Sequence, residues 1–294
     1  MFKRLPVLCT LLIALVGCGG QEDRAAGEQR APAASTATAP ATTAPTPAAA
    51  SSGTPAGSAS AAPVASAPAA ATSAPASAAS TPAANAADEG RWVEGRDYFR
   101  IEPQQPKVTG TDKIEVVEVF SFGCPACNAY HLTAARLAKS LPSGAVMVYL
   151  PASFIPQENW PMLQRAYLTA QALGVPDDKG MDAMYDAVWK TRELTAYKPS
   201  GDGLLPQSEL PTIEDAAKVY ARLGVDPKEF VAVAHSFAIN TKMKRADELV
   251  KAYGVEGTPT IVIDGKYRFS PMAVGAEQSI ALAQWLVARE ASGR

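Results

Sequence analysis

The chain has 294 residues, of which 47% are hydrophobic and 19% are charged, and its formal net charge is −2. A charge so close to neutral argues against a nucleic-acid-binding protein, which would carry a strong basic excess. Residues 90–294 have the mixed composition of a globular domain, and they are numerous enough to bury a substantial core.

Residues 1–17 have the pattern of a bacterial signal peptide. Lys3 and Arg4 precede an apolar stretch, 5–16, that is shorter than the roughly 20 residues of a membrane-spanning helix. The sequence LVGC at 15–18 resembles a lipobox, in which the cysteine becomes the first mature residue and is lipidated; an ordinary cleavage site is the alternative. We therefore expect Cys18 to anchor the protein to a membrane, on the periplasmic side, through lipid chains.

Residues 18–89 are expected to form a disordered linker. Between 31 and 87 the chain is almost entirely Ala, Pro, Ser and Thr, with no charged and no aromatic residue. Such a segment cannot bury enough apolar surface to offset the entropy lost on ordering, and its prolines interrupt any long helix. The linker would let a domain reach partners at a distance from its anchor.

The remaining residues, 90–294, alternate strand and helix patterns as an α/β domain does. An edge strand is predicted at 98–101, and a β-branched apolar strand buried on both faces at 114–122. A second strand of that kind is predicted at 145–150, after a helix at 128–141.

Helices dominate the segment that follows, and a hairpin and a helix close the chain. The Asp-Gly pair at 264–265 is a strong turn signal between strands at 260–263 and 266–269, and 278–289 predicts an amphipathic helix. A loop is predicted at 199–211. The predicted helices of the middle segment are 160–174, 181–191, 213–223, 227–237 and 241–253.

The motif Cys124-Pro125-Ala126-Cys127 lies between the buried strand and the first helix. A helix N-terminus offers unpaired N–H groups and the positive end of the helix dipole, which favour ionisation of the first cysteine. Pro125 suits the first helical turn, and Cys127 is close enough to form a disulfide with Cys124. The motif therefore predicts a redox-active dithiol.

A structural disulfide and half of a zinc site are the alternatives for this motif. Zinc needs about four ligands, and beyond the CxxC the mature chain offers no second cysteine pair and only His131 and His235. Acylation would consume Cys18, which leaves the CxxC pair as the free thiols. No metal site is expected.

Three segments resemble the DsbA family of periplasmic thiol:disulfide oxidoreductases over most of 97–290. They are EVFSFGCPAC at 118–127, GTPT at 257–260 and the end of the 230–269 stretch, DGKY at 264–267. The resemblance implies a thioredoxin-like fold with an inserted helical domain at about 156–250.

The resemblance also implies roles for individual residues. Cys124 would be the attacking cysteine and Cys127 the resolving one. Pro259 would be a cis-proline facing the disulfide, with a trans proline that opens a strand as the alternative. The backbone of Thr258 would then pair with an extended substrate chain beside Cys124.

Glu118 lies six residues before Cys124 on a strand that should be apolar. A buried carboxylate is costly unless it has a function, and we expect it to exchange a proton with Cys127; a solvent-facing strand end is the alternative. The family pattern has a basic residue in the next strand, whereas 146–150 carries no charge, so we expect a more strongly raised pKa for Glu118.

The histidines and aromatic residues carry weaker signals. His131, seven residues after Cys124, either lies over the same face of the helix or is a solvated polar residue, and the second interpretation is favoured. His235 is assigned no chemistry. Core packing is the expected explanation for four aromatic residues at roughly helical spacing, which are Trp160, Tyr167, Tyr185 and Trp189.

Ala126 stands where the usual family motif has histidine. Histidine can place a positive charge or an N–H donor beside the thiolate, and alanine can do neither. The pKa of the reactive cysteine is about 3.5 in DsbA itself and about 7 in thioredoxin. We expect a pKa between these values for Cys124, and therefore an oxidant milder than DsbA. Pro125 and Ala126 are thus the redox-tuning positions.

These observations predict a lipid-anchored oxidase that acts on the cysteines of exported proteins. The oxidase would need no cofactor beyond its Cys124–Cys127 disulfide. The resemblance implies reoxidation by a quinone-linked membrane partner of the DsbB kind. A reductase or isomerase fed by a reducing partner is the alternative within this class, and Ala126 keeps it open. A copper chaperone using both cysteines and His131, and a tethered non-catalytic binding module, are alternatives from other classes.

Overall fold

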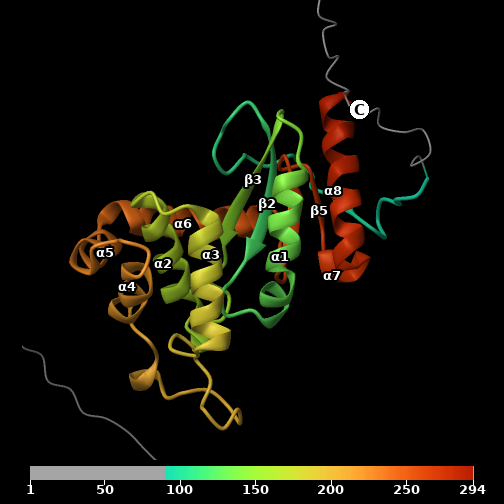
Figure 1. The fold of residues 1–294 in the computed structure, drawn as a ribbon. Coiled ribbons are helices and arrows are strands. Elements are labelled where there is room, and N and C mark those ends of the chain that lie inside the picture. Colours follow the sequence, from blue (N-terminus) through green and yellow to red (C-terminus); the bar gives the residue numbers. More distant parts are fainter. Residues whose placement is uncertain (1–89, 294) are drawn as a thin grey trace, which may run out of the picture. The chain divides into compact units, whose positions relative to one another are not determined.

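The computed structural model describes residues 90–293, and they contain a five-stranded mixed sheet of order β1-β5-β4-β2-β3 (Figure 1). Strands β2 and β3 are parallel, whereas β4 pairs antiparallel with both β2 and β5, and β1 pairs antiparallel with β5. The α/β fold class is therefore confirmed. The strands are β1 (Phe99–Arg100), β2 (Ile114–Phe120), β3 (Ala145–Pro151), β4 (Thr260–Ile263) and β5 (Tyr267–Phe269).

Helices cover both faces of this sheet. Figure 1 shows α1 and α8 side by side on one face, while the chain between β3 and β4 forms the inserted helical domain. The helices are α1 (Pro125–Ser140), α2 (Trp160–Ala172), α3 (Asp177–Tyr185), α4 (Ile213–Ala221), α5 (Pro227–Ala234), α6 (Phe237–Ala252), α7 (Pro271–Val274) and α8 (Ala276–Ala291). Shorter helical segments are η2 (Pro156–Glu158), the π-helical η3 (Asp186–Lys190) and η4 (Gln207–Glu209).

Strand β2 separates two hydrophobic clusters because its side chains alternate between the faces of the sheet. Val116 packs in one cluster with Tyr130 of α1 and Leu286 of α8, whereas Val117 packs in the other with Leu249 of α6. The prediction of a strand buried on both faces is confirmed for β2. It is wrong for β3, which lies at the edge of the sheet and keeps Val146, Met147 and Tyr149 half-buried.

Several element boundaries differ from those predicted. Helix α5 ends at Ala234 and α6 begins at Phe237, because the Ser236 hydroxyl accepts the Ile239 N–H at 3.3 Å and caps the new helix. The predicted loop at 199–211 contains η4, and a bridge joins Tyr197 to Leu204.

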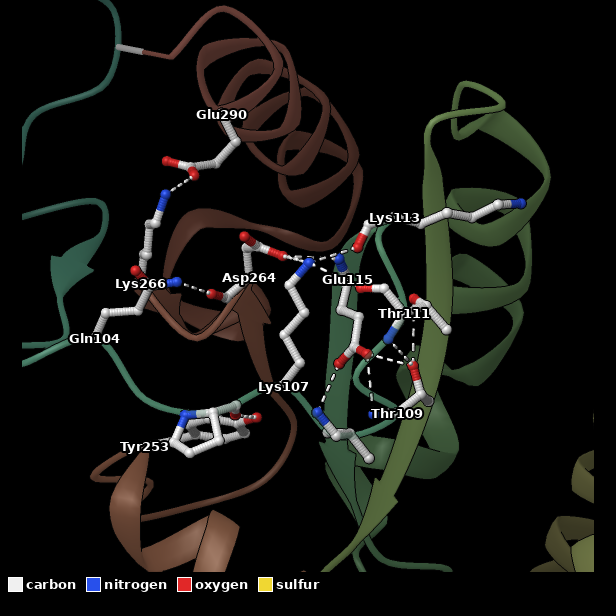
Figure 2. Close-up of polar contacts among 12 residues, drawn as sticks. Gln104, Lys107, Thr109, Thr111, Lys113, Glu115, Tyr253, Asp264, Lys266 and Glu290 are labelled. Carbon is white, nitrogen blue, oxygen red and sulfur yellow. Dashed lines mark hydrogen bonds and ion pairs between the residues drawn. The ribbon is translucent and has the colours of Figure 1, made fainter.

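A polar cluster fixes the segment before β2 to the end of the sheet opposite the CxxC motif (Figure 2). The buried Glu115 carboxylate accepts the N–H groups of Val108 at 2.7 Å and Thr109 at 2.9 Å, together with the Thr109 hydroxyl. Lys107 forms an ion pair with Asp264 at 3.0 Å. Asp264 begins the predicted hairpin turn and accepts the Glu115 N–H at 3.3 Å, so one cluster joins the turn to β2.

Residues 1–89 lie outside the described part of the chain, and with them the predicted signal peptide, Cys18 and the linker. Among the helices of residues 90–293, none is both long enough and apolar enough to cross a bilayer.

Candidate active site

The CxxC motif occupies the junction between β2 and α1. Cys124 is the N-cap of α1, with φ −85° and ψ 119°, and Pro125 is the first residue of the helix. The first helical hydrogen bond follows from this geometry, because the Asn128 N–H donates to the Cys124 carbonyl at 3.0 Å. The sulfur of Cys124 therefore lies where unpaired N–H groups and the helix dipole favour a negative charge.

The two cysteines are free thiols with different surroundings. Cys124 is 6% exposed and Cys127 is fully buried. The pKa of Cys124 is lowered from 9.0 to about 6, chiefly because the Cys127 thiol donates a hydrogen bond to its sulfur, and the backbone N–H groups of Cys127 and Ala126 also contribute. Burial raises the pKa of Cys127 well above its usual value. A thiolate is therefore favoured on Cys124 and a protonated thiol on Cys127.

Thr258 and Pro259 lie beside Cys124 although they are more than 130 residues away in the sequence. The Cys124 sulfur lies 3.3 Å from the Thr258 carbonyl oxygen, to which it donates a hydrogen bond when it is protonated. The Thr258–Pro259 peptide bond is cis, as expected, and Pro259 is buried. The Thr258 hydroxyl is buried, and the Thr258 side chain is one of the groups that lower the pKa of Cys124.

Glu118 lies on β2 with its side chain fully buried, which excludes the solvent-facing alternative. Neither carboxyl oxygen has a hydrogen-bond partner within residues 90–293. Burial raises the pKa of Glu118 from 4.5 to about 8, and the nearby Cys124 adds to the shift. Tyr149 is its partner residue on β3, so the position directly opposite holds no basic side chain.

His131 is packed between α1 and α3, so the favoured prediction of a solvated residue is wrong. Its ring stacks on Tyr185 with centroids 4.7 Å apart, and its Nδ1 lies 2.8 Å from the Asn128 carbonyl oxygen. Its Nε2 lies 3.6 Å from a carboxylate oxygen of Asp182. In the described chain, no group of three or more His, Cys, Asp or Glu side chains is arranged to hold a metal ion.

Two tryptophans of the helical insertion position the loop that leads into Cys124. The Trp189 indole N–H donates to the Phe122 carbonyl oxygen at 2.7 Å. A Cβ added to Gly123 would lie 2.5 Å from Nε1 of Trp160, so a larger residue would displace the loop or the ring. Trp160 is buried, as the core-packing prediction expected, but the contact of Trp189 with the redox loop is long-range and has no local sequence signal.

Comparison with known proteins agrees with this site. The DSBA-like thioredoxin domain matches residues 115–287. The thiol:disulfide interchange protein DsbA of Pseudomonas aeruginosa is 34% identical over 205 residues, which are 69% of this chain and 88% of that relative. The DsbA of Azotobacter vinelandii is 32% identical over 201 residues, which are 68% of this chain and 85% of that relative.

Solved structures give the same result. The crystal structure of Pseudomonas aeruginosa DsbA superposes with a TM-score of 0.58 at 32% identity, covering 69% of this chain and 97% of that one. The oxidoreductase DsbA from Xylella fastidiosa has the same TM-score at 27% identity, covering 68% of this chain and 98% of that one. The chain thus belongs to the DSBA-like thioredoxin-domain family and is a thiol:disulfide oxidoreductase.

Proposed function

We propose that this protein is a dithiol oxidase that introduces disulfides into exported polypeptides through its Cys124–Cys127 pair. The observation that carries the proposal is the contrast between the two thiols. Cys124 keeps a small exposed area of 6% and its pKa is lowered to about 6, whereas Cys127 has no exposed area and its pKa is raised. A thiol that ionises easily is a good leaving group, and a dithiol stabilised in this way favours release of oxidised substrate.

In the first step a substrate thiolate attacks the sulfur of Cys124 in the oxidised enzyme. The Cys124–Cys127 bond breaks, a mixed disulfide forms between substrate and Cys124, and the electron pair leaves on Cys127. Attack is directed to Cys124 because Cys127 has no exposed surface.

In the second step another thiolate of the substrate attacks its own sulfur in the mixed disulfide. A substrate disulfide forms and Cys124 leaves as a thiolate, stabilised by its position at the start of α1. Two substrate thiols have then been oxidised and the enzyme disulfide has been reduced.

Glu118 is the group we assign to proton exchange with Cys127. The thiolate released on Cys127 is buried, so it must acquire a proton that bulk water does not deliver directly. The Glu118 carboxyl group is also buried, with a pKa of about 8 and no competing hydrogen bond from the described residues. A carboxyl group with such a pKa can donate a proton near neutral pH and take it back during reoxidation.

The backbone of Thr258 is the proposed contact for the substrate main chain. Its carbonyl oxygen is 3.3 Å from the Cys124 sulfur, so a polypeptide joined to that sulfur passes directly beside it. An extended substrate segment would add a short strand-like pairing here, which depends little on substrate sequence.

Trapping of mixed disulfides tests the proposed function. In a Cys127→Ser variant the buried thiol is absent, so reaction with an oxidised substrate peptide should stop at a stable adduct on Cys124, detectable by mass spectrometry. The matched Cys124→Ser variant should trap little or nothing, because its remaining thiol is buried and protonated. Equal trapping by the two variants would contradict the assignment.

We further propose that the oxidase is periplasmic, is lipid-anchored through Cys18 and is reoxidised by a quinone-linked membrane protein of the DsbB kind. The lipobox-like LVGC sequence and the long uncharged segment 31–87 of the linker support the anchor. Membrane fractionation of a Cys18→Ala variant tests it: the variant should appear in the soluble fraction, and retention in the membrane would reject the anchor.

A further inference from the structure

A cavity of about 320 Å³ opens beside the redox motif, on the side of the helical insertion. Its walls come from the first residue of α1, from η3 and from the loop that follows η3. The lining residues are Pro125, Val188, Trp189, Arg192, Thr195, Tyr197 and Gly201. Thr258 and Pro259 are not among them, so the cavity is distinct from the backbone contact proposed above.

The cavity lies within reach of any polypeptide that reacts with Cys124. Pro125 is covalently joined to Cys124 and forms part of the cavity wall. Consecutive residues of an extended chain are about 3.3 to 3.6 Å apart, so a residue next to the reacting cysteine of a substrate can place its side chain here. Burial is the main cause that raises the pKa of Tyr197 to about 12, and the nearby Glu158 and Cys124 add to the rise.

The walls are fixed before any ligand binds. The Trp189 indole is held by its hydrogen bond to the Phe122 carbonyl oxygen, and its ring lies 6.3 Å from that of Tyr197. The loop is closed by the Leu205 N–H, which donates to the Ala196 carbonyl oxygen at 2.8 Å. A preformed cavity costs a ligand little ordering of the protein.

The chemistry of the lining selects an apolar ligand. Two aromatic rings, a proline and a valine make up most of the wall. Arg192 is the one charged residue among the described residues that line it, and its guanidinium already donates to the Lys198 carbonyl oxygen at 2.9 Å. The volume is at the lower end of the range for small-molecule sites, roughly 300 to 1,000 Å³, and suits a single large side chain.

We propose that this cavity is a substrate subsite that binds an aromatic or large aliphatic side chain adjacent to the reacting cysteine. The inference rests on the proposed function, because it assumes that a cysteine-containing polypeptide reacts with Cys124. The backbone contact at Thr258 does not depend on the substrate sequence, whereas this subsite would make the reaction prefer certain sequences. Substrate cysteines with a bulky apolar neighbour are oxidised fastest.

Short peptides with one cysteine test the subsite on the full-length oxidised protein. Each peptide has one cysteine in a chain of glycines. The residue directly before the cysteine, or the residue directly after it, is Phe, Leu or Gly. Two peptide thiols reduce the Cys124–Cys127 disulfide and become a peptide disulfide, and the rate is followed by acid quenching and mass spectrometry. In one of the two placements, Phe and Leu peptides should react at least about tenfold faster than the Gly peptide, as expected for burial of one large apolar side chain.

Two variants with different structural effects should reduce this ratio toward one. Tyr197→Ala removes part of the wall. Gly201→Asn places a polar amide at the cavity, where the added Cβ has no described heavy atom within 4 Å and asparagine tolerates the local φ of +82°. The matched control is Gly224→Asn, at a glycine with φ +92° and equal free space that lies outside the lining, and it should keep the wild-type ratio.

The outcomes separate the subsite from the proposed function. Equal rates for Phe, Leu and Gly peptides in both placements, or a preference that both cavity variants retain, would overturn the subsite while leaving the oxidase intact. A protein that oxidises none of the peptides, and no glutathione either, would instead reject the proposed function.

Discussion

Strand β2 buries two glutamates that have different surroundings. Glu115 and Glu118 are both fully buried, but the Glu115 carboxylate accepts hydrogen bonds from Val108 and Thr109 (Figure 2), whereas Glu118 has no such partner in the described chain. A buried polar group without partners costs free energy. Glu115 therefore has a structural role, and Glu118 is the candidate for proton exchange.

The pKa of Glu118 predicts how stability depends on pH. The unfolded carboxyl group ionises near 4.5, whereas the folded group does so at about 8, so folding favours the protonated form. The stability that this group contributes is fully present below pH 4.5 and is lost as the pH rises to about 8, by an amount on the order of 4 kcal/mol. Glu118→Gln cannot ionise and should escape this loss.

Urea unfolding of the reduced protein at pH 5 and pH 8 measures the difference. The Glu118→Gln variant should match the wild type at pH 5 and exceed it at pH 8. Cys124 acts in the opposite direction, since its lowered pKa adds stability as the pH rises from about 6 to 9, but both proteins share it. Glu115→Gln is the matched control and should lose stability at both pH values. If the difference in unfolding free energy between Glu118→Gln and the wild type is the same at both pH values, the assigned pKa is contradicted.

Single residues were predictable where a local rule governs them. A charged residue in an apolar strand marked Glu118, and its burial is confirmed. Glu115 sits in the same strand and carried no distinguishing signal, because its partners come from the preceding segment. The stacking of His131 on Tyr185 joins α1 to α3, and the spacing of residues within one helix cannot reveal it.

At the scale of elements, the first turn of α1 sets the properties of Cys124. The pKa of about 6 arises from hydrogen bonds of Cys127 and of the helix N-terminus, with alanine at 126. A histidine there would add a charge-assisted contact to the thiolate, worth about 1.5 to 3 kcal/mol.

Ala126→His should therefore lower the pKa of Cys124 below about 6 and make the protein a stronger oxidant by some tens of millivolts. Thiolate absorbance against pH and equilibration with glutathione measure the two quantities. Ala138→His, more than three turns along α1, is the control and should change neither. An unchanged or more reducing potential in Ala126→His would show that this position does not set the redox balance.

The loop before α1 depends on a close approach to the helical insertion. A Cβ at Gly123 would lie 2.5 Å from Nε1 of the buried Trp160, so Gly123→Ala should lower stability by about 1 to 3 kcal/mol. Thermal unfolding should show a decrease of several degrees. Gly144→Ala is the control, because no described atom lies within 4 Å of its added Cβ. Equal effects of the two substitutions would contradict the role of this contact.

Elements with a strong local pattern were predicted well, and their ends were not. The Asp264-Gly265 turn is found with positive φ at both residues, as its composition requires. The sequence predicted a break between two helices at 238–240, but the structure has it at 235–236, because the Ser236 hydroxyl caps the start of α6. The edge position of β3 depends on pairing across the sheet, which its apolar composition does not reveal.

At the scale of the whole molecule, the site is assembled from distant parts of the chain. The CxxC motif follows β2, Thr258 precedes β4, and Trp189 comes from the helical insertion between them. The CxxC motif itself predicted the redox cysteines, and the family resemblance predicted Thr258, because both motifs are short and local. The contribution of the insertion depends on packing between elements, so it emerged only from the structure.

The in vivo redox state of Cys124 and Cys127 tests the central claim most directly. Cells are quenched in acid, free thiols are labelled with a reagent that adds mass, and the full-length protein is separated by size. A dithiol oxidase awaiting substrate holds its cysteines as a disulfide, so we predict that most of the protein remains unlabelled at this pair. A pair found mostly labelled would identify a reductase or isomerase and would contradict the oxidase.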